Sequence, residues 1–197
     1  MAKRKNYRPL MALVALAAAA LVAATVTFTN VTYWLINATK PPAMKYPGTD
    51  TAVAGGQYVK VSYYYDSDRG INITRISIIG FTGDPTNYTS VIRVCNYYGT
   101  TPITAYLAWV GQVGSTGYES YIRAFLVGRL VRSPAVIDGV GFVGSTTYNT
   151  AGPYIVNPGQ CIDIGAYVAI DPAVPASLAD GRTVLGQYQV NIRMSPS

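Results

Sequence analysis

The sequence predicts an all-β fold, a single-domain β-sandwich of the jelly-roll type, and three observations support this prediction. The composition favours strands and turns, with 17 Tyr and 19 Gly, and it contains a single glutamate, Glu119. Apolar and polar residues alternate in short runs that turn signals interrupt, which gives about seven to nine strands. The 197 residues are enough for one well-packed core and too few for two.

Residues 1–24 have the layout of a secretory signal peptide. A basic cluster at residues 3–8 precedes an apolar stretch of roughly 15 residues, which is shorter than the ~20 needed to span a bilayer. Small residues at 22–24 suit signal peptidase, so we expect a secreted chain that starts near Thr25 and meets the membrane only during export. A retained membrane anchor is the alternative. A type IV pilin leader is disfavoured because it needs a small residue at the cut before the hydrophobic run, and Arg8-Pro9-Leu10 does not supply one.

Charge and residue types exclude several function classes. Four of the 15 Lys and Arg residues leave with the leader, so 11 remain against 9 acidic residues, which gives no electrostatic footprint for nucleic acid. The chain contains no His, which removes the usual general base, Ser-His triads and imidazole metal sites. We therefore expect neither an enzyme nor a cofactor.

Acidic side chains do not form a convincing metal or catalytic site. The aspartates outside the first turn are scattered along the chain, with no spacing that indicates a catalytic dyad: Asp84, Asp138, Asp163, Asp171 and Asp180. The turn at residues 66–70 faintly resembles a calcium loop, but it lacks the later oxygen ligands and the closing glutamate. A plain β-turn is the preferred interpretation of this segment.

Two kinds of covalent feature are expected outside the cell. Cys95 and Cys161 form an even pair in an oxidising compartment, so a disulfide is predicted, and closing so long a loop stabilises by roughly 4 kcal/mol in the chain-entropy model. Two buried free thiols are the alternative. Four Asn-X-Thr sequons are candidate N-glycosylation sites, at Asn30, Asn37, Asn72 and Asn87.

Residues 57–197 are predicted to form the sandwich domain. Strands are expected at residues 58–65, 71–79, 90–98, 103–113, 119–131, 154–156, 161–170 and 186–194. The turn at 66–70 predicts one hairpin, and the turn at 157–160 predicts another that pairs 154–156 with 161–170. Residues 119–131 fit both helical and strand spacing, and we favour a strand. The Pro-rich residues 171–181 predict a loop.

The first mature residues, 25–36, form a nearly pure run of strand formers. Its apolar residues fall on both parities of a strand: Val26, Phe28, Trp34 and Ile36 on one, and Val31, Tyr33 and Leu35 on the other. Residues 40–56, which contain Pro and Gly, are expected to link this run flexibly to the domain. An exposed strand of this kind is an aggregation hazard, so it must pair with something.

Two pairings of residues 25–36 are open. The run is either the first strand of its own sandwich or a donor strand that completes the sheet of a neighbouring copy, and head-to-tail donation generates an open filament. Asn30 limits the second arrangement, since it shares the parity of Phe28 and a glycan there could not enter a groove. Either Asn30 is unmodified, or the inserted part begins or changes face at that point.

The plan of the chain resembles the TasA/camelysin family of extracellular fibre proteins, in particular the bundling pilins of hyperthermophilic archaea. The likeness covers most of the mature chain. It is carried by the run at 25–36 directly after the signal, the turn at 156–160 leading into 162–164, and the closing strand at 187–193 after a Pro/Ala loop. The resemblance implies jelly-roll subunits polymerised by donor-strand complementation into biofilm pili. A metallopeptidase activity attributed to some members does not carry over, since HExxH is absent, and the cysteine pair is a departure from bacterial members.

We therefore expect a subunit of an extracellular filament whose partners are copies of itself and, in bundles, laterally associated filaments. The alternative is a monomeric, secreted or surface-anchored β-sandwich module that binds carbohydrate through Tyr63–Tyr65 and Tyr97–Tyr98 as stacking platforms. Tyrosines of a secreted sandwich are more often packing residues. An envelope or S-layer component is a third reading, for which the chain is short.

Overall fold

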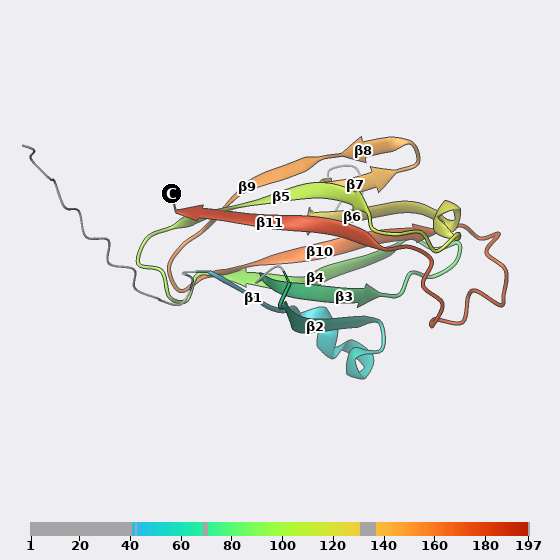
Figure 1. Cartoon of the computed structure of the whole chain (residues 1–197), viewed down its shortest axis with the longest axis horizontal. Helices are drawn as coiled ribbons and strands as arrows, with labels where there is room; N and C mark the ends of the chain where they lie inside the picture. The colour runs from blue at the N-terminus through green and yellow to red at the C-terminus, as the bar shows by residue number, and fades with distance from the viewer. Residues whose placement is uncertain (1–40, 42, 69–70, 131–136, 197) are drawn as a thin grey trace, which may run out of the picture. The chain divides into compact units, whose positions relative to one another are not determined.

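The largest sheet of the computed structural model, which describes residues 41, 43–68, 71–130 and 137–196, contains six antiparallel strands (Figure 1). Its order is β1 (Met44–Pro47), β4 (Thr86–Cys95), β10 (Cys161–Ile170), β6 (Ile122–Leu130), β7 (Ile137–Val143) and β8 (Thr146–Tyr148). All described residues belong to one compact unit, which is bounded at Lys40–Ser197.

The remaining strands form two smaller antiparallel sheets. One has three strands in the order β11 (Tyr188–Pro196), β5 (Ile103–Gln112) and β9 (Thr150–Val156), and the other is the hairpin of β2 (Val59–Asp66) and β3 (Ile71–Ile78). Short 3-10 turns occur at η1 (Thr49–Gly56) and η2 (Glu119–Tyr121). In the described part of the chain, no helix has the length and apolar character needed to cross a membrane.

The six-stranded and three-stranded sheets enclose a common core, so the fold is all-β with the layering of a β-sandwich. Alternation along β5 explains this: Ile103, Ala105 and Leu107 are buried, whereas Tyr106 between them is exposed. The core cluster draws from both sheets: Ile92, Val94, Ile162, Ile164 and Val140 from the larger one, and Ile103, Ala105, Leu107, Ala151, Tyr154 and Val156 from the smaller.

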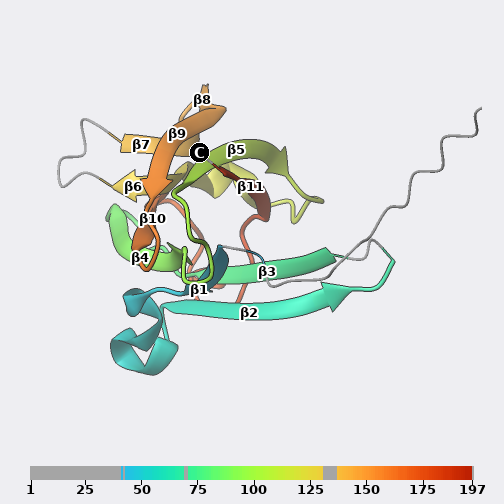
Figure 2. The ribbon, with the colours of Figure 1, turned by 90° about the vertical axis from the view of Figure 1, so that its left-hand side faces the viewer.

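The hairpin β2–β3 packs on the sandwich only at its base. There, fully buried Val59 contacts Tyr88 and Val91 of β4 and Ala166 of β10. Further out, Tyr63 and Tyr65 are largely exposed. In Figure 2 the hairpin runs across the view beneath β4 and β11, whose strands are seen closer to end-on. An isolated two-stranded hairpin is marginally stable, so this unit depends on its base contacts and on whatever else covers it.

Several predicted elements are confirmed. Strands are found close to the expected positions at β2, β3, β5, β6, β10 and β11, and residues 171–181 form a loop. The ambiguous segment at 119–131 is a strand, β6, preceded by the single turn η2. Both periodicities occurred there because the two faces of β6 are covered, with Ala124 and Leu126 buried on one and Phe125 half-buried on the other.

The predicted hairpin between residues 154–156 and 161–170 is wrong. β9 pairs with β5, and β10 pairs with β4 and β6, so the turn at 157–160 carries the chain from one sheet to the other. Buried Asn96 holds this corner: its side-chain amide donates to the carbonyl oxygens of Val156 (3.0 Å) and Thr101 (2.9 Å). A satisfied buried amide of this kind fixes a corner that strand periodicity cannot show.

Boundaries and two strands also differ from expectation. β4 begins at Thr86 and ends at Cys95, so it starts earlier than the predicted strand at 90–98 and leaves Tyr97 outside it. On the strand expected at 103–113, Val113 lies beyond the end of β5 and is exposed. The strands β7 and β8 were not predicted, because two glycines weaken the strand signal of β7 and β8 has only three residues.

The expected flexible linker at 40–56 is wrong for the residues that the structure describes there. β1 pairs with β4, and η1 is bonded to the same strand: the Gly48 N–H donates to the Val91 carbonyl (2.9 Å), and the Ser90 N–H donates to Asp50 Oδ2 (2.8 Å). A carboxylate that accepts from a backbone N–H of a neighbouring strand anchors this segment. The folded body therefore begins well before residue 57.

Candidate functional site: an apolar groove between two strand edges

An apolar groove lies between the three-stranded sheet and the hairpin β2–β3, which we treat together as the divided second layer of the sandwich. In the described part of the chain, β11 forms one edge of the three-stranded sheet and β3 forms one edge of the hairpin, and neither edge has a further strand partner. The groove of about 140 Å³ is bordered by both of these strands. Figure 2 shows β11 above β3, with β4, β10, β6 and β7 of the six-stranded sheet to their left.

The walls and floor of the groove are almost entirely aliphatic. Thr74, Ile76 and Ile78 of β3 form one wall, and Tyr188, Val190 and Ile192 of β11 form the other. The floor is made by the six-stranded sheet through Val91, Ile92, Phe125, Val127, Ile164, Gly165 and Ala166. None of the described residues that line it is charged, so the groove suits apolar side chains and would penalise a carboxylate or ammonium.

The strand pattern explains why these residues face the groove. Thr74, Ile76 and Ile78 occupy alternate positions of β3, and Tyr188, Val190 and Ile192 occupy alternate positions of β11. Alternation along the strand expected at 186–194 puts Tyr188, Val190, Ile192 and Met194 on one face, and the structure places the first three in the groove wall. Ile76 remains 36% exposed although it is aliphatic.

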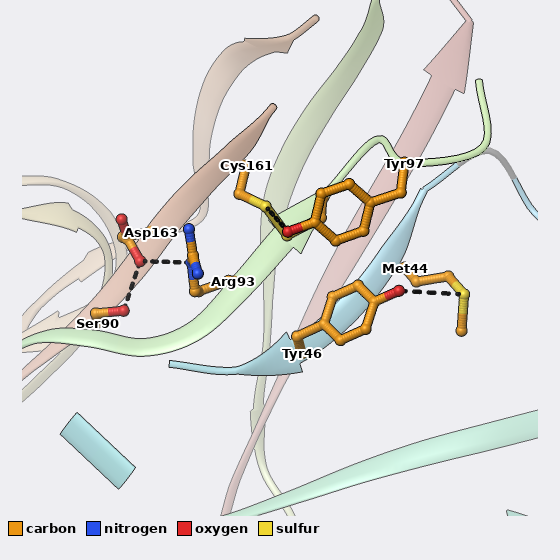
Figure 3. Close-up of a disulfide and its surroundings, with 8 residues drawn as sticks. Met44, Tyr46, Ser90, Arg93, Tyr97, Cys161 and Asp163 are labelled. Carbon is orange, nitrogen blue, oxygen red and sulfur yellow. Dashed lines mark hydrogen bonds and ion pairs between the residues drawn. A yellow bond between two sulfur atoms is a disulfide. The ribbon is translucent and has the colours of Figure 1, made fainter. Parts of the chain in front are cut away.

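The opposite end of β4 and β10 carries the disulfide. Cys95 and Cys161 face each other across the two neighbouring strands, and their sulfurs are 1.99 Å apart, which agrees with the predicted pairing. The Tyr97 hydroxyl donates to Cys161 Sγ at 3.1 Å (Figure 3). The Tyr46 ring lies 5.5 Å from that of Tyr97, centroid to centroid. Burial and the neighbouring Tyr98 raise the pKa of Tyr46, so a tyrosine cluster flanks the disulfide.

A polar network beside the disulfide fixes the position of η1. The Ser90 hydroxyl donates to Asp163 Oδ1 (2.5 Å) and accepts from the Thr49 N–H (3.1 Å), while Arg93 Nε lies 3.4 Å from the same Asp163 oxygen (Figure 3). Ser90 is buried, and its hydroxyl has partners on both sides. These contacts connect β4, β10 and η1, so we assign this polar cluster a structural role.

The other predicted site residues are only partly within the described residues. The signal at 1–24, the proposed donor strand with Val26, Phe28, Val31, Tyr33, Trp34, Leu35 and Ile36, and the sequons at Asn30 and Asn37 all lie outside them. Asn72 is placed on β3. Asn87 and Thr89 are both exposed on β4, so this sequon is sterically open to modification.

The tyrosines proposed as stacking platforms are exposed but do not form one surface at the hairpin. Tyr63 and Tyr65 pair across the hairpin with Thr74 and Asn72, whereas Tyr64 pairs with Ile73 on the other face. Because neighbouring residues of a strand point to opposite faces, the three rings cannot stack against one ligand together.

Metal-binding geometry was sought throughout the described ranges. No group of three or more His, Cys, Asp or Glu side chains there could hold an ion. At the turn that faintly resembles a calcium loop, the Asp68 N–H donates to Asp66 Oδ1 at 3.1 Å. This bond is typical of a turn in which the aspartate side chain mimics the backbone.

Comparison with known proteins adds no further constraint. No protein-family model matches the chain, and no curated protein matches it at a significant level.

Proposed function

We propose that the protein is a structural subunit of an extracellular filament, in which residues 25–36 of one copy occupy the apolar groove of the next. The observation that carries this proposal is the division of the second layer, with a groove between the edges of β3 and β11. A strand inserted there would join the three-stranded sheet to the hairpin. The completed sandwich, with a jelly-roll plan, is part of the proposal.

The chemistry of the groove supports this occupant. The groove is lined by aliphatic and aromatic side chains without charge, and residues 25–36 carry seven large apolar side chains and no charged one. Backbone pairing with two edges would also satisfy N–H and C=O groups that an exposed edge leaves to water. The hairpin, marginal by itself, would gain a third strand.

Donation between copies follows from secretion of a chain whose first mature residues must find a partner. A heterologous contact that does not close repeats indefinitely and makes a filament. The proposal includes a cleaved leader, an extracellular location and a non-enzymatic role, with copies of the chain as the principal partners.

Charge placed in the groove tests the proposal. Ile76 is already partly exposed, so Ile76→Asp is expected to leave the subunit folded, while insertion of an apolar strand over the carboxylate becomes unfavourable. Filament assembly, followed by sedimentation and electron microscopy, should require at least about a hundredfold higher protein concentration. The matched control is Ser77→Asp, because Ser77 is exposed on the other face of the same strand.

The two variants give a clear contrast. Wild-type assembly by Ser77→Asp together with failure by Ile76→Asp supports the groove as the acceptor. Equal assembly by both variants would contradict it, provided that circular dichroism shows both to be folded.

A further inference from the structure

A second concave site, separate from the disulfide end, opens between the two sheets. It is a cleft of about 680 Å³, bordered by the end of β5, the start of β11, η2 and the β7–β8 turn, which gather at the right of Figure 1. Its volume falls in the range of small-molecule sites in proteins, about 300–1,000 Å³. The residues that matter below are Trp109, Phe142 and Tyr188 on its wall and Gln112, Glu119, Arg123 and Asp171 on its rim.

The wall consists of three half-buried aromatic rings in mutual contact. The rings of Trp109 and Tyr188 are stacked, with centroids 5.5 Å apart and planes at 28°. Phe142 lies 6.0 Å from Trp109 and 5.3 Å from Tyr188. Tyr188 also stacks on Phe125, with centroids 5.3 Å apart and planes at 25°, so these rings hold one another in place and the part of them that lines the cleft is rigid.

The rim is polar and held in place. Glu119 Oε1 accepts from the Thr116 N–H and from Gln112 Nε2 (3.0 Å). Asp171 accepts from Arg123 Nε (2.8 Å) and from the Ala173 N–H (2.9 Å). The Arg123 side chain is nevertheless 64% exposed, and a guanidinium has five N–H donors, more than one carboxylate oxygen can use.

The charges of the rim select among ligands. Two carboxylates, Glu119 and Asp171, outnumber the single guanidinium of Arg123, so anionic ligands such as phosphates, nucleic acids and acidic sugars are disfavoured. Burial, together with the charge of Glu119, raises the pKa of Tyr188, which keeps its hydroxyl as a neutral donor and acceptor. The cleft thus combines an apolar face with uncharged and charged hydrogen-bonding groups.

We propose that this cleft binds a neutral carbohydrate. A pyranose ring has an apolar C–H face, which would lie on the aromatic wall, and hydroxyl groups that both donate and accept, which would meet Arg123, Gln112 and the carboxylates. The proposal goes beyond the filament function and does not depend on it, because the cleft and the groove share Tyr188 but no other lining residue. The ligand proposed for the cleft is therefore a neutral glycan.

Trp109 provides a direct readout. The chain has two Trp residues, Trp34 and Trp109, so Trp34→Phe leaves Trp109 as the sole indole. Mature full-length protein with this substitution, in whatever assembled form it takes, is titrated with four neutral hexasaccharides: maltohexaose, cellohexaose, mannohexaose and chitohexaose. At least one should shift the Trp109 emission in a saturable way.

Variants within that background identify the site. Arg123→Ala removes an exposed donor and should weaken binding on the order of tenfold, and Phe142→Ala should weaken it similarly through the lost wall. Tyr97→Ala is the control, since it alters an exposed tyrosine beside the disulfide, and it should bind like its parent.

Three results would overturn the proposal. One is the lack of a saturable response to any of the four sugars at tens of millimolar, including the case in which acrylamide cannot quench Trp109 because a neighbouring copy covers the cleft. Another is a stronger response to an anionic polymer such as polygalacturonate. The third is unchanged affinity in both Arg123→Ala and Phe142→Ala.

Discussion

At the scale of single residues, the contacts of Asp171 predict its titration. The Ala173 N–H is the largest single cause that holds the pKa of this carboxyl below its ordinary 3.8, and the hydrogen bond and the charge of the Arg123 guanidinium both add to it. Arg123→Ala should therefore raise the pKa only part of the way, and Arg123→Lys should raise it less. Carbon-detected NMR titration of the carboxyl measures both values. A fully ordinary pKa in Arg123→Ala would contradict this ranking of causes.

The sign of the pH effect follows from the lowered pKa. A carboxyl whose folded pKa lies below its unfolded pKa stabilises the fold at pH values above the unfolded value. That contribution is lost as the pH falls through the lower, folded pKa. The pKa of Glu119, lowered mainly by the Thr116 N–H, acts in the same direction, so both contributions to the cleft rim persist in mild acid and are lost only as the pH falls below the ordinary values of 4.5 and 3.8.

Alanine substitutions at two glycines, one in β7 and one just after it, distinguish the cost of a steric clash from the cost of backbone strain. Gly141 and Gly144 both have positive φ (136° and 56°), but a Cβ on Gly141 would lie 2.0 Å from the Phe125 carbonyl oxygen, whereas a Cβ on Gly144 would meet nothing within 4 Å. Gly144→Ala should cost about 1 kcal/mol of unfolding free energy. Gly141→Ala should cost more than about 3 kcal/mol, since backbone atoms must move.

Urea unfolding of the two glycine variants measures this difference directly. Similar losses in both would contradict the close approach of β6 and β7. The result bears on the fold because the pairing Leu126–Gly141 brings these strands together at a position where only glycine fits.

At the scale of elements, alternation of apolar residues predicted β2, β3, β5 and β11 well, because one face of each is covered and the other is wet. The alternation does not indicate which strands pair with one another. The turn at 157–160 looks like a hairpin turn in sequence, and only the tertiary contacts of Asn96 make it a corner between sheets. β7 was not predicted because its glycines allow close strand packing but weaken the strand pattern, and β8 was not predicted because it has only three residues.

For the candidate sites too, the face of a strand could be predicted from sequence, whereas the contacts between strands could not. The groove-facing residues of β11 could be predicted as one face of a strand, but not that this face borders a gap, since the gap depends on which described strands pair with one another. The aromatic cleft was missed entirely. Trp109, Phe142 and Tyr188 come from three separate strands, and nothing in their spacing indicates that they meet.

The disulfide makes a prediction about the pairing of β4 with β10. It joins directly opposed residues of neighbouring strands with a sequence separation of 66. Removing it in Cys95→Ala/Cys161→Ala should lower the free energy of unfolding by roughly 4 kcal/mol without changing the fold, because the backbone ladder on both sides remains. Denaturant unfolding and circular dichroism of the double variant check this, and a loss below about 1 kcal/mol would contradict it.

At the scale of the whole molecule, the sandwich has one complete layer and one divided layer. In the proposed filament, residues 25–36 of a neighbouring subunit complete the divided layer, so each subunit is joined to the next. Deleting residues 25–36 should give a subunit that remains folded, since the described residues of the two sheets already share a buried core cluster, but that no longer polymerises. An unfolded deletion variant would favour the alternative in which this run is the first strand of its own sandwich.

The most direct measurement locates the strand that covers Ile76. A photoreactive benzophenone residue replaces Ile76 in mature protein, mixed from ¹⁴N-labelled and ¹⁵N-labelled copies, and mass spectrometry identifies the cross-linked peptides after irradiation. We predict cross-links to residues 25–36 with mixed isotope labels, which only contact between copies can produce. Cross-links to the same residues with both halves always from one isotope would show that each molecule fills its own groove, and the account of a filament built by strand exchange would be contradicted.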